Sequence, residues 1–421
     1  MKLKEVKGLK FVEGGVCAAK GFRANGICCG LRHQALADAP ELDIQANAAG
    51  KIKNDLALIV ADKECTAAAV YTTNKVKGAP IQVTKEHIRD GTAKAVIVNS
   101  VNANTCNADG VEKAEKMCAL AAAELGIDEN DVIVASTGVI GQILPIEPIA
   151  DGMKALAEGL AYDGNSRAVE AIMTTDTMPK EAAVQFEMGG MLKGSGMIHP
   201  NMATTLTFIT TDADISAELL QRALSDIVKI TLNRVSVDGD TSTNDMVCVL
   251  ASGTAENKPV TKENKDFAIF ENALYGLMMN LARMMARDGE GATKLIECVV
   301  SGADTEKTAE IVAKSVITSS LFKAAMFGED ANWGRILCAV GYADADFDIS
   351  NVAVSISSDK GAVEVCKNGS GVDFSEEKAK EILGEEVIDI IISIGDGSGT
   401  AAAWGCDLTY DYVKINGDYR S

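Results

Sequence analysis

The chain has 421 residues, 47% of them hydrophobic, and a formal net charge of −20 at pH 7. This length and apolar content can support a large packed core, which excludes an intrinsically disordered chain. The acidic balance argues against nucleic acids and anionic membrane surfaces as partners, because both need basic patches on the protein. We therefore expect small molecules or other subunits as partners.

Two further features bound the class of protein. Residues 1–15 are basic but lack the apolar run of a signal peptide, and no later stretch is apolar over the length of a membrane span. We therefore expect a cytoplasmic protein. The eleven cysteines include no C-x-x-C pair, and the histidines at positions 33, 87 and 199 share no metal-ligand spacing. The sequence predicts no metal site and disfavours a histidine-based catalytic triad.

The first half of the chain predicts a mixture of helices and strands. Residues 111–125 carry apolar side chains at helical spacing and end at Gly126, a suitable helix C-cap. Residues 131–136 form a short, partly β-branched apolar run, which predicts a buried strand. That strand leads into Thr137 and Gly138, in a loop of the kind where catalytic groups are often found.

The second half continues the mixture. Residues 204–210 predict a strand, and Ser216 is suited to cap the start of a helix. Apolar positions in register predict one helix over residues 307–327. Residues 352–369 alternate like a β-hairpin, and residues 375–383 predict another helix. Because no regular βα unit repeats, the pattern predicts an α+β fold of layered sheets and helices rather than a doubly wound sheet.

A glycine-rich loop that begins at Lys193 leads to an Ala203–Thr204 bond at the start of the strand predicted for residues 204–210. A threonine hydroxyl is a weak nucleophile without a neighbouring base, and a free α-amine on the same residue is such a base. The reference pKa of that amine, roughly 7.7 to 8, suits proton transfer near neutral pH. The amine exists only after cleavage. The residues alone therefore leave two interpretations, an ordinary loop-to-strand junction or a self-cleavage site.

The segment that spans this bond, KGSGMIHPNMATTL, resembles the self-cleavage signature of the ornithine acetyltransferase family, the glutamate N-acetyltransferases of the cyclic arginine pathway. Ten further blocks resemble the family in the same order: GFRANGICCGLR, NDLALIVAD, TTNKVKGAP, IVNSVNANTC, ASTGVIGQ, MTTDTMPKEAA, SVDGDTSTND, RDGEGATK, FGEDANWGRI and YVKINGDYRS. The resemblance implies a layered α+β fold of the N-terminal-nucleophile type. It also implies an α chain of residues 1–203 and a β chain of residues 204–421, with a smaller C-terminal α+β subdomain at about 300–421.

The resemblance assigns roles to individual residues. Thr204 is the implied nucleophile. Thr137 and Gly138, which by themselves indicate either a turn or a pair of oxyanion donors, match the family's oxyanion hole. Lys193 and Glu290 would otherwise be interpreted as solvated surface charges. The implied substrate-binding residues are Thr174, Lys193, Thr204, Glu290, Asn416 and Ser421.

Some residues depart from the family pattern. Methionine is frequent at the position of Thr205, threonine is usual at that of Ser421, and His199 is unusual within the cleavage loop. None of these changes removes a proposed catalytic atom. Residues 238–245 are rich in acidic and hydroxyl side chains but lack the spacing of an EF-hand, so we expect a hydrogen-bonded loop there.

The predicted function is transfer of acetyl from N-acetylornithine to glutamate through an acetyl-Thr204 ester. No metal or organic cofactor is expected, and acetyl-CoA is a candidate second donor. The family implies an α2β2 assembly of two cleaved protomers. Two other functions stay open. One is an N-terminal-nucleophile aminopeptidase or amidase, which passes the acyl group to water. The other is an uncleaved small-molecule-binding protein.

Overall fold

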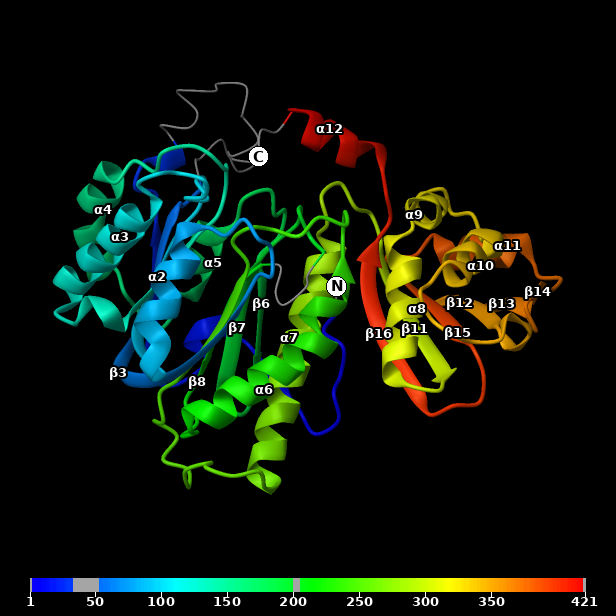
Figure 1. The fold of residues 1–421 in the computed structure, drawn as a ribbon, viewed down its shortest axis with the longest axis horizontal. Helices are drawn as coiled ribbons and strands as arrows, with labels where there is room; N and C mark the ends of the chain where they lie inside the picture. The colour runs from blue at the N-terminus through cyan, green and yellow to red at the C-terminus, as the bar shows by residue number, and fades with distance from the viewer. Residues whose placement is uncertain (1, 33–52, 200–204, 419–421) are drawn as a thin grey trace.

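The computed structural model describes residues 2–32, 53–199 and 205–418. Two β-sheets lie side by side, and the long helix α7 (Lys265–Arg287) stands between them (Figure 1). Further helices pack against each sheet, so the molecule is built of layers of helix and sheet. The predicted α+β fold class is confirmed.

Within the described residues, the first sheet has nine strands in the order β1-β6-β7-β8-β10-β3-β4-β5, with β2 paired to β3. Its strands are β1 (Phe11–Val12), β2 (Phe22–Ile27), β3 (Leu56–Tyr71), β4 (Thr92–Asn99), β5 (Val132–Ser136), β6 (Lys180–Val184), β7 (Met188–Lys193), β8 (Leu206–Thr211) and β10 (Met246–Ala251). Strand β8 runs parallel to β10 and β4 parallel to β5, whereas the other pairs are antiparallel.

A bend in β3 brings distant strand ends together. The register of β3 with β4 shifts between Val60 and Cys65, around the exposed residues 62–64, and Figure 1 shows β3 curving there. The end of β5 and the start of β10 therefore meet on one side of the sheet. The Asn244 side-chain amide, just before β10, donates to the carbonyl of Ser136 at 3.0 Å.

Helices cover both faces of this sheet. They are α2 (Ala79–His87), α3 (Gly110–Leu125), α4 (Glu147–Glu158), α5 (Asn165–Ile172), α6 (Ala217–Ile230) and α7. In β4, Val96 and Val98 pack with α5, while Ala95 and Ile97 pack with α3 and α4. Side chains of a strand alternate between faces, so burial of both faces explains the unbroken apolar run in β4. Helices α6 and α7 cover the half of the sheet built from β6, β7, β8 and β10.

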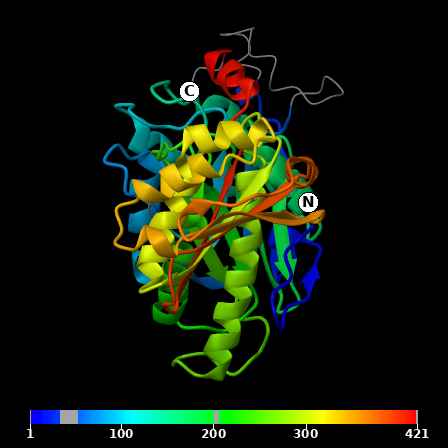
Figure 2. The same ribbon diagram turned by 90° about the vertical axis from the view of Figure 1, so that its right-hand side faces the viewer.

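The second sheet has seven described strands in the order β14-β13-β12-β15-β11-β16-β9. Its strands are β9 (Val235–Ser236), β11 (Leu295–Ala303), β12 (Ala353–Ser358), β13 (Gly361–Lys367), β14 (Ser370–Gly371), β15 (Val387–Ser393) and β16 (Gly399–Cys406). The helices here are α8 (Glu306–Thr318), α9 (Ser320–Phe327), α10 (Trp333–Gly341) and α11 (Glu376–Leu383). Figure 2 shows this sheet and its helices on the near side of the molecule. Strand β11 begins before residue 300, and β9 joins the sheet from an earlier part of the chain.

Several predicted elements are confirmed. Helix α3 ends at Gly126, whose left-handed φ of 65° makes it the C-cap. Strand β5 and the β12–β13 hairpin occupy their predicted segments. Ser216 caps α6 by accepting from the Leu219 amide at 3.4 Å, and Ser375 caps α11 in the same way.

The single helix predicted for residues 307–327 is wrong. The chain breaks at Ser319, whose backbone is extended and whose hydroxyl accepts from the Phe322 amide. That side chain ends the course of α8 and caps the start of α9, since serine competes for backbone hydrogen bonds at helix ends. The apolar pattern continues across the break because both helices bury a face in the same core.

Candidate active site

The loop after β5 is fixed by backbone hydrogen bonds. The Thr137 amide donates to the Asn99 carbonyl at 3.0 Å, and the Val139 amide donates to the Val101 carbonyl at 2.8 Å. Gly138 has a φ of 132°, and a Cβ there would lie 2.0 Å from the carbonyl carbon of Val101. Only glycine fits this position. Among the described residues, the Thr137 hydroxyl and the Gly138 amide have no hydrogen-bond partner, so both can serve an outside acceptor.

Thr137 and Gly138 line a cavity of about 180 Å³. Residues from several separate segments complete its wall: Ala103, Ile140, Thr174, Thr175, Lys193, Gly196, Met197, Asp238, Asp240, Ser242, Thr243, Asn244, Glu290, Tyr412 and Asn416. The structure thus brings together the predicted residues Thr137, Gly138, Thr174, Lys193, Glu290 and Asn416. Because these residues lie far apart in the sequence, no short motif shows that they line one cavity.

The loop after β7 is held by an aspartate. Asp238 accepts hydrogen bonds from the amides of Met197 and Ile198, at 2.7 and 2.8 Å. Met197 adopts the left-handed φ of 56°, which is uncommon for a residue other than glycine. The predicted hydrogen-bonded loop at residues 238–245 is confirmed. Asp238 also lines the cavity, a role that the sequence analysis missed.

Glu290 faces the cavity from the turn after α7. It is 8% exposed, and its carboxylate accepts from the Asn416 side chain at 2.7 Å. A Cβ on Gly196 would lie 2.3 Å from the Glu290 carboxyl carbon, so glycine allows the close approach of the two loops. Asn416 belongs to α12 (Tyr410–Asp418), which lies above the junction of the two sheets in Figure 1.

Negative charge dominates the cavity. Glu290, Asp238 and Asp240 line it, with Lys193 as the one basic residue among the described lining residues. Burial raises the pKa of Tyr412, and these three carboxylates raise it further. The side of the cavity near Tyr412 can therefore attract an ammonium group, while Lys193 can bind a carboxylate.

A smaller hollow of about 20 Å³ adjoins the cavity and shares with it Thr137, Lys193, Gly196, Met197, Ser242 and Asn244. Thr205 also lines this hollow and is 5% exposed. Ala203 and Thr204, the predicted cleavage site, lie outside the described residues, as does Ser421. Thr205, the first described residue after the predicted cleavage site, therefore lines the same hollow as Thr137 of the candidate oxyanion loop.

His199 lies in the loop after β7. Its Nδ1 is 3.1 Å from the Ser236 hydroxyl, and burial lowers the pKa of its imidazole. The neutral ring is therefore favoured. Within the described residues, no three histidine, cysteine or acidic side chains are grouped so as to hold a metal ion. None of the described helices has the length and apolar character needed to cross a membrane.

Sequence reasoning also missed Asn244 and Tyr412. Asn244 donates to the carbonyls of Ala103 and Ser136, at 2.6 and 3.0 Å, and so ties the start of β10 to the loop after β4 and to the end of β5. The motifs SVDGDTSTND and YVKINGDYRS contain both residues, but nothing local in them shows which side chains face a cavity.

Comparison with known proteins finds relatives over nearly the whole chain. An arginine biosynthesis bifunctional protein ArgJ of Clostridium acetobutylicum is 47% identical over 93% of this chain and 98% of its own length. The protein of the same name from Caldanaerobacter subterraneus subsp. tengcongensis is 46% identical over 98% of this chain and 100% of its own. A crystal structure of the Bacillus halodurans protein shares 48% identity, covers 50% of this chain and 98% of its own, and superposes with a TM-score of 0.48.

The model of the ArgJ family matches residues 42–421. This match covers most of the chain, and the two curated relatives extend over nearly all of it. The chain belongs to the ArgJ family. The resemblance noted in the sequence is confirmed.

Proposed function

We propose that this protein is an acyltransferase of arginine biosynthesis that moves acetyl from N-acetylornithine to glutamate. Its nucleophile is Thr204, freed as a new N-terminus by cleavage of the Ala203–Thr204 bond. The observation that carries the proposal is the cavity itself. In it, Thr137 and Gly138 lie with Lys193 and Glu290, and the adjoining hollow reaches Thr205. Family membership, and relatives that are named arginine biosynthesis bifunctional proteins, support a role in the same pathway.

In the proposed cycle, the Thr204 α-amine takes the hydroxyl proton as Oγ attacks the acetyl carbonyl. The tetrahedral oxyanion accepts hydrogen bonds from the Thr137 hydroxyl and the Gly138 amide, the two donors left free in that loop. The C–N bond then breaks, and the ornithine α-amine leaves with the proton. Glutamate attacks the acetyl-Thr204 ester through its own α-amine, the steps run in reverse, and Thr204 is regenerated.

Charges in the cavity suit both amino acids. In the proposal, Lys193 pairs with the α-carboxylate that ornithine and glutamate share, and Glu290 meets an ammonium group of ornithine. Thr174, Asn416 and Ser421 supply further hydrogen bonds to the substrate. This chemistry needs no metal or organic cofactor.

Cleavage would divide the chain into an α chain of residues 1–203 and a β chain of residues 204–421, with the C-terminal subdomain at about 300–421. We propose an α2β2 assembly in the cytoplasm. The α chain carries Thr137, Thr174 and Lys193, and the β chain carries Glu290 and Asn416, so each chain supplies part of one site.

The test compares transfer with hydrolysis. Purified protein is incubated with N-acetylornithine, with and without glutamate, and ornithine and N-acetylglutamate are measured. The proposal expects equal amounts of both products and little ornithine without glutamate. Hydrolysis without transfer would instead indicate an amidase. Replacing N-acetylornithine by acetyl-CoA in the same assay tests whether the second donor is used.

A further inference from the structure

A buried group of three charged residues lies behind the cavity wall and does not line it. Lys180, the first residue of β6, has no exposed surface, and its Nζ donates to Asp176 at 2.7 Å and to Asp288. Asp176 and Asp288 are 2% and 5% exposed. A lysine so deeply buried is costly unless it is paired, so the carboxylates account for its presence.

Each carboxylate also accepts hydrogen bonds from backbone amides. Asp176 accepts from the amides of Thr174 and Gly194, at 3.0 and 2.8 Å. Asp288 accepts from the amide of Thr177 at 3.0 Å and from its hydroxyl. Lys180 therefore links the loop after α5, the end of β7 and the turn after α7.

Each of these three segments carries one of the predicted substrate-binding residues. Thr174 is itself held by Asp176, Lys193 precedes Gly194, and Glu290 follows Asp288 by two positions. The Glu290 amide donates in addition to the Ser195 carbonyl at 3.0 Å, one residue beyond Gly194. A movement at Lys180 would thus be passed to all three segments.

Lys180 and Asp176 both stay charged near neutral pH. Burial by itself would lower the pKa of Lys180, but Asp176 and Asp288 outweigh it and raise that pKa. Burial by itself would raise the pKa of Asp176, but Lys180 and Lys193 outweigh it and lower that pKa. Asp176 therefore stays ionised between two lysines, and one of them, Lys193, lines the cavity.

We propose that Asp176, Lys180 and Asp288 are positioning residues that set the spacing between the carboxylate-binding Lys193 and the ammonium-binding Glu290. This inference rests on the proposed function. Binding groups held at the wrong spacing lose contacts that the substrate makes alike in the ground state and the transition state, which raises KM and leaves kcat nearly unchanged. A purely structural ion triad would instead affect folding and leave substrate affinity unchanged.

The experiment compares Asp288→Asn with Glu297→Gln as a matched control. Glu297 is 2% exposed and pairs with Lys4 and Arg283 at 2.8 and 2.7 Å, so its loss removes a buried ion pair that holds no cavity segment. KM and kcat for N-acetylornithine, with kcat per cleaved chain, and the melting temperature are measured for both variants. We expect Asp288→Asn to raise KM at least about tenfold with kcat changed less than about threefold. Glu297→Gln should lower the melting temperature at an unchanged KM.

The double variant Lys180→Met/Asp288→Asn covers the case in which Asp288→Asn fails to fold. It removes one positive and one negative charge, so the net charge of the group is unchanged, and Asp176 keeps the attraction of Lys193 and its two backbone amide donors. It should fold and show the same rise in KM. KM within twofold of the wild type in the folded variants would overturn the inference. If the wild type itself transfers no acetyl, the proposed function fails, which is a distinguishable result.

Discussion

Buried polar side chains gather at the strand ends of the first sheet that border the site, whereas the second sheet packs against an apolar core. Asn99, Ser136 and Asn244 are each at most 6% exposed and bond one another or nearby carbonyls. The buried hydrophobic cluster of the second sheet gathers side chains from β11, β12, β15 and β16 with α8 to α11. Buried polar groups are costly unless satisfied, so they fix one backbone arrangement at the site, while the second sheet contributes packing.

The second sheet still reaches the site through the segments just before β11 and just after β16. Asp407, after β16, accepts from the amides of Thr293 and Lys294 at 2.8 and 3.0 Å, and the Thr409 hydroxyl donates to the Gly291 carbonyl at 2.7 Å. These bonds hold the turn that carries Glu290. Substitutions in the first region should therefore change catalysis, and those in the core of the second should change stability.

Gly138→Ala should have the largest effect on activity. A Cβ there collides with the Val101 carbonyl, so the oxyanion loop must move and acetyl transfer should fall about 1,000-fold per cleaved chain. Gly126→Ala is the control, since Gly126 also has a positive φ but no atom lies within 4 Å of its Cβ position. It should lower stability by about 1 kcal/mol and leave turnover unchanged. Near-normal transfer by Gly138→Ala would contradict the assigned role.

Ile356→Ala should show the reverse pattern. Ile356 is fully buried in the core of the second sheet, so its loss should lower the free energy of unfolding by about 3 kcal/mol. Chemical denaturation in a Thr204→Ala background allows the comparison to be made on one uncleaved chain. In the cleavable protein, a large change in KM would break the division between the two regions.

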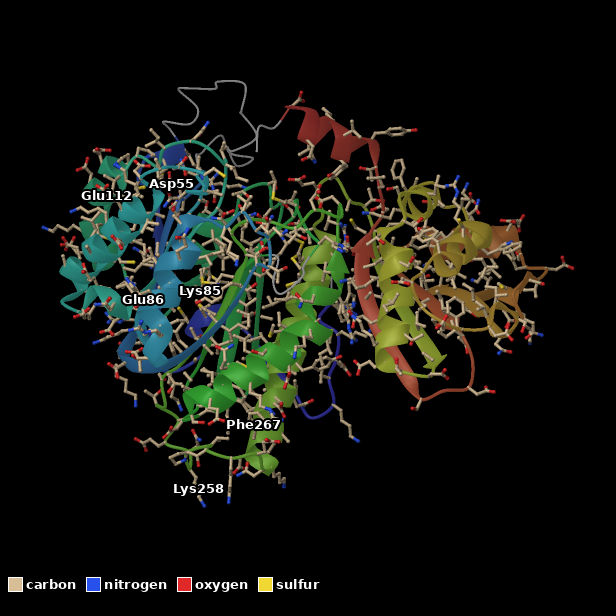
Figure 3. The ribbon with its side chains drawn as sticks, in the orientation of Figure 1. Asp55, Lys85, Glu86, Glu112, Lys258 and Phe267 are labelled. Atoms are coloured by element: carbon tan, nitrogen blue, oxygen red, sulfur yellow. The ribbon has the colours of Figure 1, made fainter. Side chains whose placement is uncertain are left out.

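Glu290→Gln tests the turn after α7, where the site of the first sheet meets segments of the second sheet. Loss of the charge should raise KM for N-acetylornithine about tenfold, equivalent to about 1.4 kcal/mol. Glu112→Gln is the control. Glu112, labelled in Figure 3, is an exposed residue of α3 and does not line the cavity. Equal KM values in the two variants would argue against an ammonium-binding role for Glu290.

The smallest effect concerns a carboxyl pair at the far end of the first sheet. Burial and the adjacent Glu187 raise the pKa of Asp212 to about 7. The folded state therefore holds a proton that the unfolded state releases near pH 4, so this contribution to stability falls as pH rises from about 4 to 7. The hydrogen bond from Asp212 lowers the pKa of Glu187, which offsets part of the effect.

Asp212→Asn should remove this decrease in stability with rising pH. Between pH 5 and pH 8, the free energy of unfolding should fall by about 1 kcal/mol more in the wild type than in the variant, as measured by thermal unfolding. Parallel pH profiles for the two proteins would show that the pair does not share a proton. Acetyl transfer should not respond to this substitution, since neither carboxyl lines the candidate site.

Local sequence patterns predicted much of the secondary structure. Gly126 and Ser216 mark helix ends through their own backbone or side-chain chemistry, which neighbouring residues suffice to define. The break at Ser319 was missed because the apolar register continues through it. The register shift in β3 around residues 62–64 was also beyond local patterns, since it depends on pairing with β4.

The candidate site was predictable only in part. The family resemblance pointed to Thr137, Lys193 and Glu290, and the structure brings them to one cavity. It did not point to Lys180, which carries no local sign of burial and acquires its partners through contact with Asp288, far along the chain. Such long-range contacts depend on the arrangement of the sheets rather than on any short motif.

Intact-mass measurement under denaturing conditions tests the central claim most directly. The account predicts two fragments, residues 1–203 and 204–421, from the expressed protein and a single full-length chain from Thr204→Ala. An uncleaved wild-type chain that still transfers acetyl, or a cut at any other bond, would contradict the account.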